Sequence, residues 1–199
     1  MANQSSTMTK RQQQAAEMKL KIYRNAVFLF KTKPYESITI ADICAASGIS
    51  MGNFYHYFKD KNDVLNQAFQ SAEIKFYDRI KDTSLPPIEQ ILFELTIYGE
   101  IWTDAGYRFM SVSMQNEILH LIPYKGSVNR PYFNHLEKLL AAALDNGDLI
   151  NGNPQILYSD LIRVMKGTLY DWIICQESFS LVDELHRMAN LVLKPYMPQ

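Results

Sequence analysis

The first clear pattern in the sequence is a row of apolar residues at the spacing of one helix face. Its members are Met18, Ile22, Ala26, Leu29 and Phe30. This spacing predicts an amphipathic helix. We expect the helix to begin near residue 11 and to end before Pro34, because the residue that precedes a proline is pushed out of the helical conformation.

Two short helices are predicted next, over 39–46 and from 50 to about 57. Thr39 and, three residues later, Asp42 form a start that resembles a capping box. Gly48 stands where a left-handed residue would end a helix, and Ser50 is a second N-cap. Two short helices joined by a tight turn with glycine, packed on a longer first helix, form a helix-turn-helix arrangement.

The rest of the chain also has helical spacing. Asp60 can cap a helix with Asp63 at its third position, and this helix is expected to run to about Asp82. Further helices are expected near 86–104, 107–120, 131–145, 154–177 and 181–194, separated by Gly, Pro and Ser residues. We find no convincing strand alternation. The predicted fold class is therefore all-α, with an N-terminal three-helix helix-turn-helix domain and a C-terminal helical domain.

The expected helix over 154–177 is apolar nearly all round, which indicates burial on more than one side. The last helix offers a matching apolar edge, so two such hairpins from two chains would form a four-helix dimer interface. A central core helix in a monomer is the alternative. The residues predicted at the dimer interface are Leu161, Met165, Leu169, Ile173, Leu185, Met188 and Val192.

Charge is distributed unevenly, although the net charge of the chain is only −1. Residues 1–65 hold nine Lys and Arg against five acids, whereas the remainder holds eleven against sixteen. A basic front and an acidic rear suggest different partners. Two cysteines form no disulfide framework, and we see neither a secretory signal nor a membrane span. We expect a cytoplasmic protein.

The second short helix has the residue types of a helix that enters the major groove of DNA. Gly52 allows close approach to the backbone, and Asn53 can both donate and accept at a base edge. Tyr55, His56 and Tyr57 combine ring area with polar tips that suit phosphates. Lys59 and Lys61 supply positive charge.

The segment 22–65, IYRNAVFLFKTKPYESITIADICAASGISMGNFYHYFKDKNDVL, closely resembles the DNA-binding domain of tetracycline-repressor-type (TetR) regulators. The likeness rests on the Ala-x-x-Leu-Phe of the first helix, the ITIADI entry, the SGIS turn and the GNFYHYF…K…L signature. Cys44 stands where alanine is usual. The resemblance implies that Phe54 and Phe58 are buried. It places these residues at or near DNA: Thr39, Ser50, Met51, Gly52, Asn53, Tyr55, His56, Tyr57 and Lys61.

The resemblance also implies a division into a disordered polar arm (1–10), a DNA-binding domain (11–65) and a ligand-binding and dimerisation domain (66–199). Ligand binding in this family moves the helix that begins near Asp60. Candidate pocket residues are Tyr98, Trp102, Phe109, Met110, Met114, Met165 and Trp172, with ordinary core packing as the alternative for each. Four acids would favour a cationic ligand if they were buried rather than solvated: Glu94, Glu100, Asp104 and Glu117.

These features predict a homodimeric, ligand-responsive repressor that leaves a palindromic DNA operator when a small apolar or aromatic effector binds. The alternatives are an activator of the same fold and a helical bundle that binds metal or catalyses a reaction. The four histidines lack metal-ligand spacing, and the single Glu117/His120 pair would need further ligands. We therefore expect no enzyme activity, no cofactor and no metal.

Overall fold

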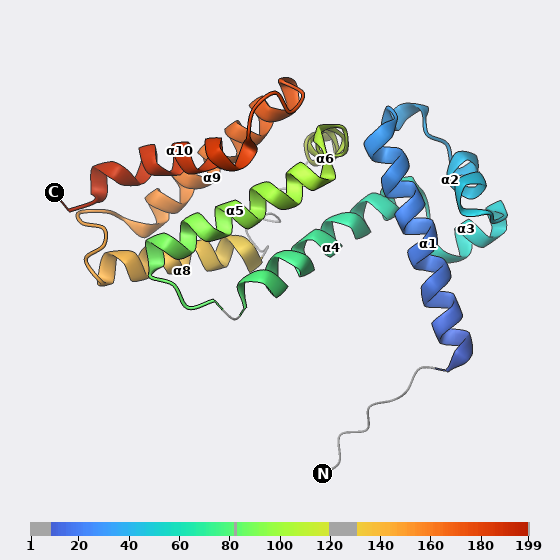
Figure 1. Cartoon of the computed structure of the whole chain (residues 1–199), viewed down its shortest axis with the longest axis horizontal. Helices are drawn as coiled ribbons and strands as arrows, with labels where there is room; N and C mark the ends of the chain where they lie inside the picture. Colours follow the sequence, from blue (N-terminus) through green and yellow to red (C-terminus); the bar gives the residue numbers. More distant parts are fainter. Residues whose placement is uncertain (1–8, 82, 120–130, 199) are drawn as a thin grey trace, which may run out of the picture. The chain divides into compact units, whose positions relative to one another are not determined.

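The structure of the chain is a computed structural model that describes residues 9–81, 83–119 and 131–198, without the side chains of residues 69, 73, 113, 116–119 and 131–134. Within these ranges the regular structure is helical, which confirms the predicted all-α class (Figure 1). The elements are α1 (Lys10–Thr32), η1 (Tyr35–Ser37), α2 (Ile40–Ser47), α3 (Met51–Tyr57), α4 (Lys61–Ile80), α5 (Pro87–Ala105), α6 (Tyr107–Leu119), α8 (Pro131–Asp145), α9 (Pro154–Ile174), α10 (Leu181–Leu193) and η2 (Lys194–Tyr196).

The chain divides into two compact units, Met1–Gln70 and Ser71–Gln199. The division falls inside α4, a few residues beyond the boundary expected after residue 65. Each unit has its own buried apolar residues, as an independently packed domain requires.

In the N-terminal unit, α1 packs on α2, and α2 on α3. Thr9 and Gln12 form a capping box at the start of α1, so the helix begins where its first backbone N–H groups find acceptors. The centre of the unit is the predicted apolar face of α1, including Ile22, Ala26 and Phe30, which are almost completely buried. One unpredicted element, the 3₁₀ turn η1, follows Pro34.

In the C-terminal unit, α5 packs against α8 and α10, while α9 packs against the same two helices (Figure 1). Pro86 and Pro87 lie at the N-cap and the first position of α5, where proline is tolerated. Gly99 lets α5 approach α10 closely, since a Cβ there would lie 2.7 Å from Cγ2 of Val182. Trp172 of α9, 1% exposed, is the largest fully buried side chain of the described residues.

Candidate DNA-binding surface and effector domain

Local interactions set the start of α2 and the turn between α2 and α3. Thr39 caps α2 through a capping box with Asp42, and its hydroxyl donates to Asp42 Oδ2 over 2.6 Å. These hydrogen bonds from Thr39 hold the pKa of the Asp42 carboxyl below its ordinary value. Gly48 ends α2 in the left-handed region at φ 64°. Ser50 then accepts from Asn53 N over 3.3 Å and starts α3. Thr39, Gly48 and Ser50 thus have the capping roles that the sequence predicts.

The inner face of α3 anchors the helix on its unit. Phe54 is completely buried and Phe58 is 2% exposed, with ring centroids 5.9 Å apart. Both were predicted to be buried. Ser47, also fully buried, accepts a hydrogen bond from Asn25 Nδ2 over 3.3 Å and so ties α2 to α1. These contacts fix the orientation of α3 and therefore the direction in which its outer face points.

The outer face of α3 carries the predicted DNA-contacting residues. Met51 is 44% exposed and Tyr55 54% exposed, and Gly52, Asn53 and His56 are exposed as well. Tyr57 is half-buried. Exposed apolar and aromatic groups on one short helix are unusual unless the face meets a partner. Contact with DNA stays a prediction for each residue, but the described surface leaves this face accessible.

A groove of about 800 Å³ lies between α1 and the outer face of α3. Three predicted residues line it from α3: Asn53, His56 and Tyr57. On the side of α1 its walls are Arg11, Gln14, Ala15, Glu17, Met18 and Lys21. Arg11, Gln14 and Lys21 were not among the predicted site residues. These residues are separated by three and then seven positions, which places them on one face of a helix. This spacing is the sequence pattern that could have identified them.

Lys61 has partners within the N-terminal unit. Its Nζ donates to the backbone oxygens of Tyr35 over 2.8 Å and of Ile38 over 3.0 Å, and it lies 4.1 Å from the centre of the Tyr35 ring. The Tyr35 hydroxyl in turn donates to Asn62 Oδ1, and burial, with the charges of Asp60 and Glu36, raises the pKa of Tyr35 to about 12. An ammonium group has three donors, of which two are used here. Phosphate binding by Lys61 stays a prediction, whereas its tie between η1 and α4 is a structural role that sequence did not indicate.

The candidate pocket residues of the C-terminal unit are mostly interior. Five are at most 8% exposed, and two are half-buried; in chain order the seven are Tyr98, Trp102, Phe109, Met110, Met114, Met165 and Trp172. The rings of Tyr98 and Trp102 meet edge to face with centroids 5.9 Å apart. Residues of a packed core and residues that line a pocket are both buried, so burial does not distinguish the two. The role of these seven residues in ligand binding stays a prediction.

The four predicted acids of this unit differ in their surroundings. Glu94 on α5 is completely buried. Glu100 is 49% exposed and forms an ion pair with Arg79 over 2.7 Å, and Asp104 is exposed. The side chain of Glu117 and all of His120 lie outside the described residues, so the predicted Glu117/His120 pair is not tested. Among the described residues, no three His, Cys, Asp or Glu side chains are grouped as a metal site requires.

The predicted dimer interface needs a correction. Leu161, Met165, Leu169 and Leu185 are at most 5% exposed within a single chain, so they form its core and cannot face a second copy. Ile173, Met188 and Val192 are half-buried. The exposed apolar residues of this hairpin lie on the opposite side of α9 and on α10: Ile156, Tyr170, Ile174 and Leu191, each more than half exposed.

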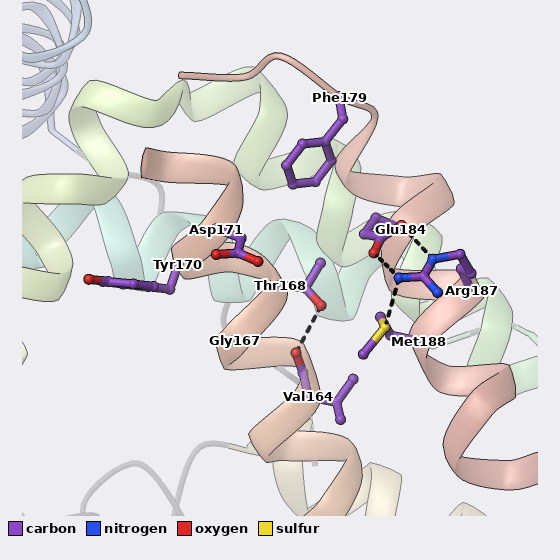
Figure 2. Close-up of a pocket in the computed structure, with 9 residues that line it drawn as sticks. All are labelled: Val164, Gly167, Thr168, Tyr170, Asp171, Phe179, Glu184, Arg187 and Met188. Atoms are coloured by element: carbon purple, nitrogen blue, oxygen red, sulfur yellow. Dashed lines mark hydrogen bonds and ion pairs between the residues drawn. The ribbon is translucent and has the colours of Figure 1, made fainter. Parts of the chain in front are cut away.

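A groove of about 590 Å³ runs between α9 and α10 beside this exposed side (Figure 2). Val164 and Thr168 of α9 face Met188 of α10 across it, with Phe179 at one end. The ion pair between Arg187 and Glu184, with Nε to Oε2 at 2.8 Å, borders the groove. Tyr170 and Asp171 also line the groove from α9.

Residues 22–68 match the family of bacterial regulatory proteins described as the tetR family. This segment is therefore a DNA-binding domain of the tetR type. The match covers the end of α1, the helix-turn-helix and the start of α4, which are the parts whose caps and anchors are described above. It agrees with the resemblance seen in the sequence.

Comparisons over most of the chain extend the likeness to the C-terminal unit. The chain is 23% identical over 181 residues to the fatty acid metabolism regulator protein of Bacillus subtilis, covering 88% of this chain and 91% of the relative. Its fold is similar to that in a SmeT–triclosan complex (TM-score 0.72, 18% identity, 92% and 93% of the two chains). It is also similar to FadR from Bacillus subtilis with stearoyl-CoA (TM-score 0.64, 18% identity, 87% and 97%).

In the part of the chain that the structure describes, none of the helices has the length and apolar character needed to span a bilayer.

Replacing Lys61 with methionine is expected to lower the free energy of unfolding of the N-terminal unit by about 1–3 kcal/mol, because two backbone carbonyls lose a charged donor. Chemical denaturation followed by circular dichroism measures this change. The matched control is Lys59→Met, since Lys59 is exposed two residues away. Equal stability of the two variants would show that the bonds to Tyr35 and Ile38 contribute little.

Proposed function

We propose that this chain is a TetR-family regulator, a homodimeric repressor that binds a palindromic operator through α3 and leaves it when a small apolar or aromatic effector binds the C-terminal unit. The observation that carries the proposal is that α3 has one buried face and one exposed face. Its inner face holds fully buried Phe54, and its outer face exposes Asn53 and Tyr55. Such an anchored, solvent-facing helix after a tight turn is what groove recognition requires.

The exposed residues of α3 and the neighbouring groove fall into two groups, one suited to base edges and one suited to DNA phosphates. Met51 and Asn53 lie at the start of the helix, where side chains of recognition helices meet base edges. The groove residues Arg11 and Lys21 are suited to phosphates, because they line the same groove as Asn53. Tyr55 is exposed on α3, and its hydroxyl is also suited to a phosphate contact.

Dimerisation is supported by the exposed side of the last two long helices. Along α9, Ile156, Gly167, Tyr170 and Ile174 recur at spacings of eleven, fourteen and eighteen residues, which places them in one straight row. Gly167 has nothing within 4 Å of an added Cβ, so a second helix can approach closely there. A dimer through this row and Leu191 of α10 would give two copies of α3, as a palindromic operator demands.

Effector binding is supported by the composition of the C-terminal unit and by its relatives. The two similar structures hold triclosan and stearoyl-CoA, ligands with a large apolar part. The buried aromatic and methionine residues of α5, α6 and α9 suit such a part, since Met adapts to varied shapes. An effector releases the operator if it binds the DNA-incompetent dimer better than the competent one.

Operator recognition is tested by selecting bound sites from a randomised DNA pool with the full chain. The wild-type protein is expected to enrich a palindrome, and Asn53→Ala to accept more bases at one position of each half-site, because a bidentate base contact is lost at a cost of about 1–3 kcal/mol. Asn146→Ala, an exposed position after α8, is the matched control. An unchanged preferred site in Asn53→Ala would contradict base readout by Asn53, and a failure of the wild type to enrich any site would contradict the function.

A further inference from the structure

The buried interior of the C-terminal unit contains a polar cluster made of Gln90 and Glu94 on α5 and His135 on α8. Gln90 is 3% exposed and Glu94 completely buried. Gln90 Nε2 donates to Glu94 Oε1 over 2.9 Å, and His135 Nδ1 lies 2.7 Å from the same oxygen. Glu94 Oε1 therefore accepts a hydrogen bond from Gln90, whereas His135 Nδ1 lies at ion-pair distance from it without making a hydrogen bond.

The other acceptors of this cluster have no partner among the residues that the structure describes. Glu94 Oε2 and Gln90 Oε1 are both buried and accept no hydrogen bond from described residues. A buried acceptor without a donor is costly, and such atoms in native proteins normally face a water, an ion or a ligand. When Glu94 is ionised both of these oxygens can only accept, so the groups that would satisfy them are donors.

An aromatic row continues from the cluster along α5. Tyr98 and Trp102 follow Glu94 at successive intervals of four residues, so their side chains lie on one ridge of the helix. Their rings are in edge-to-face contact. At the other end His135 is 38% exposed, so the cluster reaches toward solvent on that side. The ridge thus has an acceptor-rich end and an aromatic end.

We propose that Gln90, Glu94 and His135 form the polar end of the effector site and that this end selects organic cations with N–H groups, such as protonated amines attached to an apolar body. The proposal rests on the proposed function. The ammonium would donate to Glu94 Oε2 and Gln90 Oε1, while the apolar body would lie along Tyr98 and Trp102.

The electrostatics of Glu94 agree with a cationic ligand. Burial raises the pKa of the Glu94 carboxyl, an effect that the hydrogen bond from Gln90 and the nearby His135 only partly oppose. A bound cation would stabilise the ionised carboxylate that the interior disfavours. A carboxylate ligand at the same place would meet two acceptor oxygens and a like charge, and would be repelled.

The test uses the full chain without DNA and compares dodecylamine with dodecanoate by isothermal titration calorimetry below their micelle concentrations. We expect saturable binding of one dodecylamine per chain and binding of dodecanoate at least about tenfold weaker, since a charge-assisted hydrogen bond contributes that factor. Glu94→Gln should weaken dodecylamine binding about tenfold or more and leave dodecanoate unchanged or tighter. Glu89→Gln, exposed on the same helix, should behave as wild type.

A second variant allows the proposal to be tested even if Glu94→Gln does not fold. Gln90→Met removes one acceptor and keeps the Glu94 carboxyl, and it should weaken dodecylamine binding severalfold, with unfolding curves checked for every variant. Equal binding of amine and carboxylate by the wild type, or unchanged amine binding by both variants, would overturn the proposal and indicate that water occupies the cluster.

The operator-binding assay distinguishes a failure of the cation-site proposal from a failure of the proposed repressor function. If the function holds, the wild-type protein binds its selected operator in either case. Release of that operator by dodecylamine in the wild type, but not in Glu94→Gln, would link the cluster to regulation. Operator binding without amine selectivity would contradict only the cation site.

Discussion

Replacing Ile174 and Leu191 together with aspartate is expected to abolish the proposed dimer and leave a monomer. Both side chains are more than half exposed in a single chain, so the change leaves the core intact. In the proposed dimer the substitution would remove apolar burial and bring four carboxylates into one interface, where desolvated charges without partners are strongly unfavourable. Light scattering after size-exclusion chromatography measures the mass.

The same variant is expected to lose operator affinity by about 100-fold or more, although α3 is untouched. Two linked recognition helices bind a palindrome with an effective concentration that a monomer lacks. Ile150→Asp, an exposed isoleucine outside the α9 and α10 helices, is the control and should remain dimeric. A dimeric double variant would show that the second copy binds elsewhere.

Truncating Phe54 to alanine is expected to lower the free energy of unfolding of the N-terminal unit by about 3–5 kcal/mol. Phe54 is completely buried at the contact of α3 with its unit, and a cavity of that size costs this much in protein cores. Such a loss is a large part of the stability of a small domain. Urea denaturation monitored by circular dichroism measures it, and DNA binding should disappear with the fold.

The neighbouring ring provides the matched comparison for Phe54. Tyr55 is 54% exposed, so Tyr55→Ala should change the unfolding free energy by less than about 1 kcal/mol. It should nevertheless weaken operator binding with little change in the salt slope, because a neutral tyrosine displaces no counterion from a phosphate. Similar destabilisation by both substitutions would contradict the two-faced arrangement of α3.

The helix-turn-helix was predictable because its signals are local. A cap such as Thr39 or Ser50 acts on backbone groups two or three residues away, and Gly48 is needed for the conformation of its own residue. The division of the aromatic segment into buried Phe54 and exposed Tyr55 follows from helical spacing against the apolar row of α1.

Other features depend on contacts that spacing cannot reveal. The sequence suggests that Lys61 is a free cation. In the structure its ammonium donates hydrogen bonds to the backbone carbonyls of Tyr35 and Ile38, which are more than twenty positions away in the sequence. Helix α9 is apolar on nearly all sides, so its pattern could not tell which side packs on its own chain. The predicted interface around Leu161 was therefore the core.

The sequence by itself determined the all-α fold, the caps and turn that create α3, and the family of the DNA-binding segment, because each depends on residues close together along the chain. Only the tertiary structure decided which side of α9 remains exposed, that Arg11 and Lys21 flank α3, and that Glu94 alone of the described candidate acids is buried. Burial is a property of the packed neighbours of a side chain. Those neighbours come from distant segments, and for Glu94 they turn an ordinary helical glutamate into the centre of a proposed cation site.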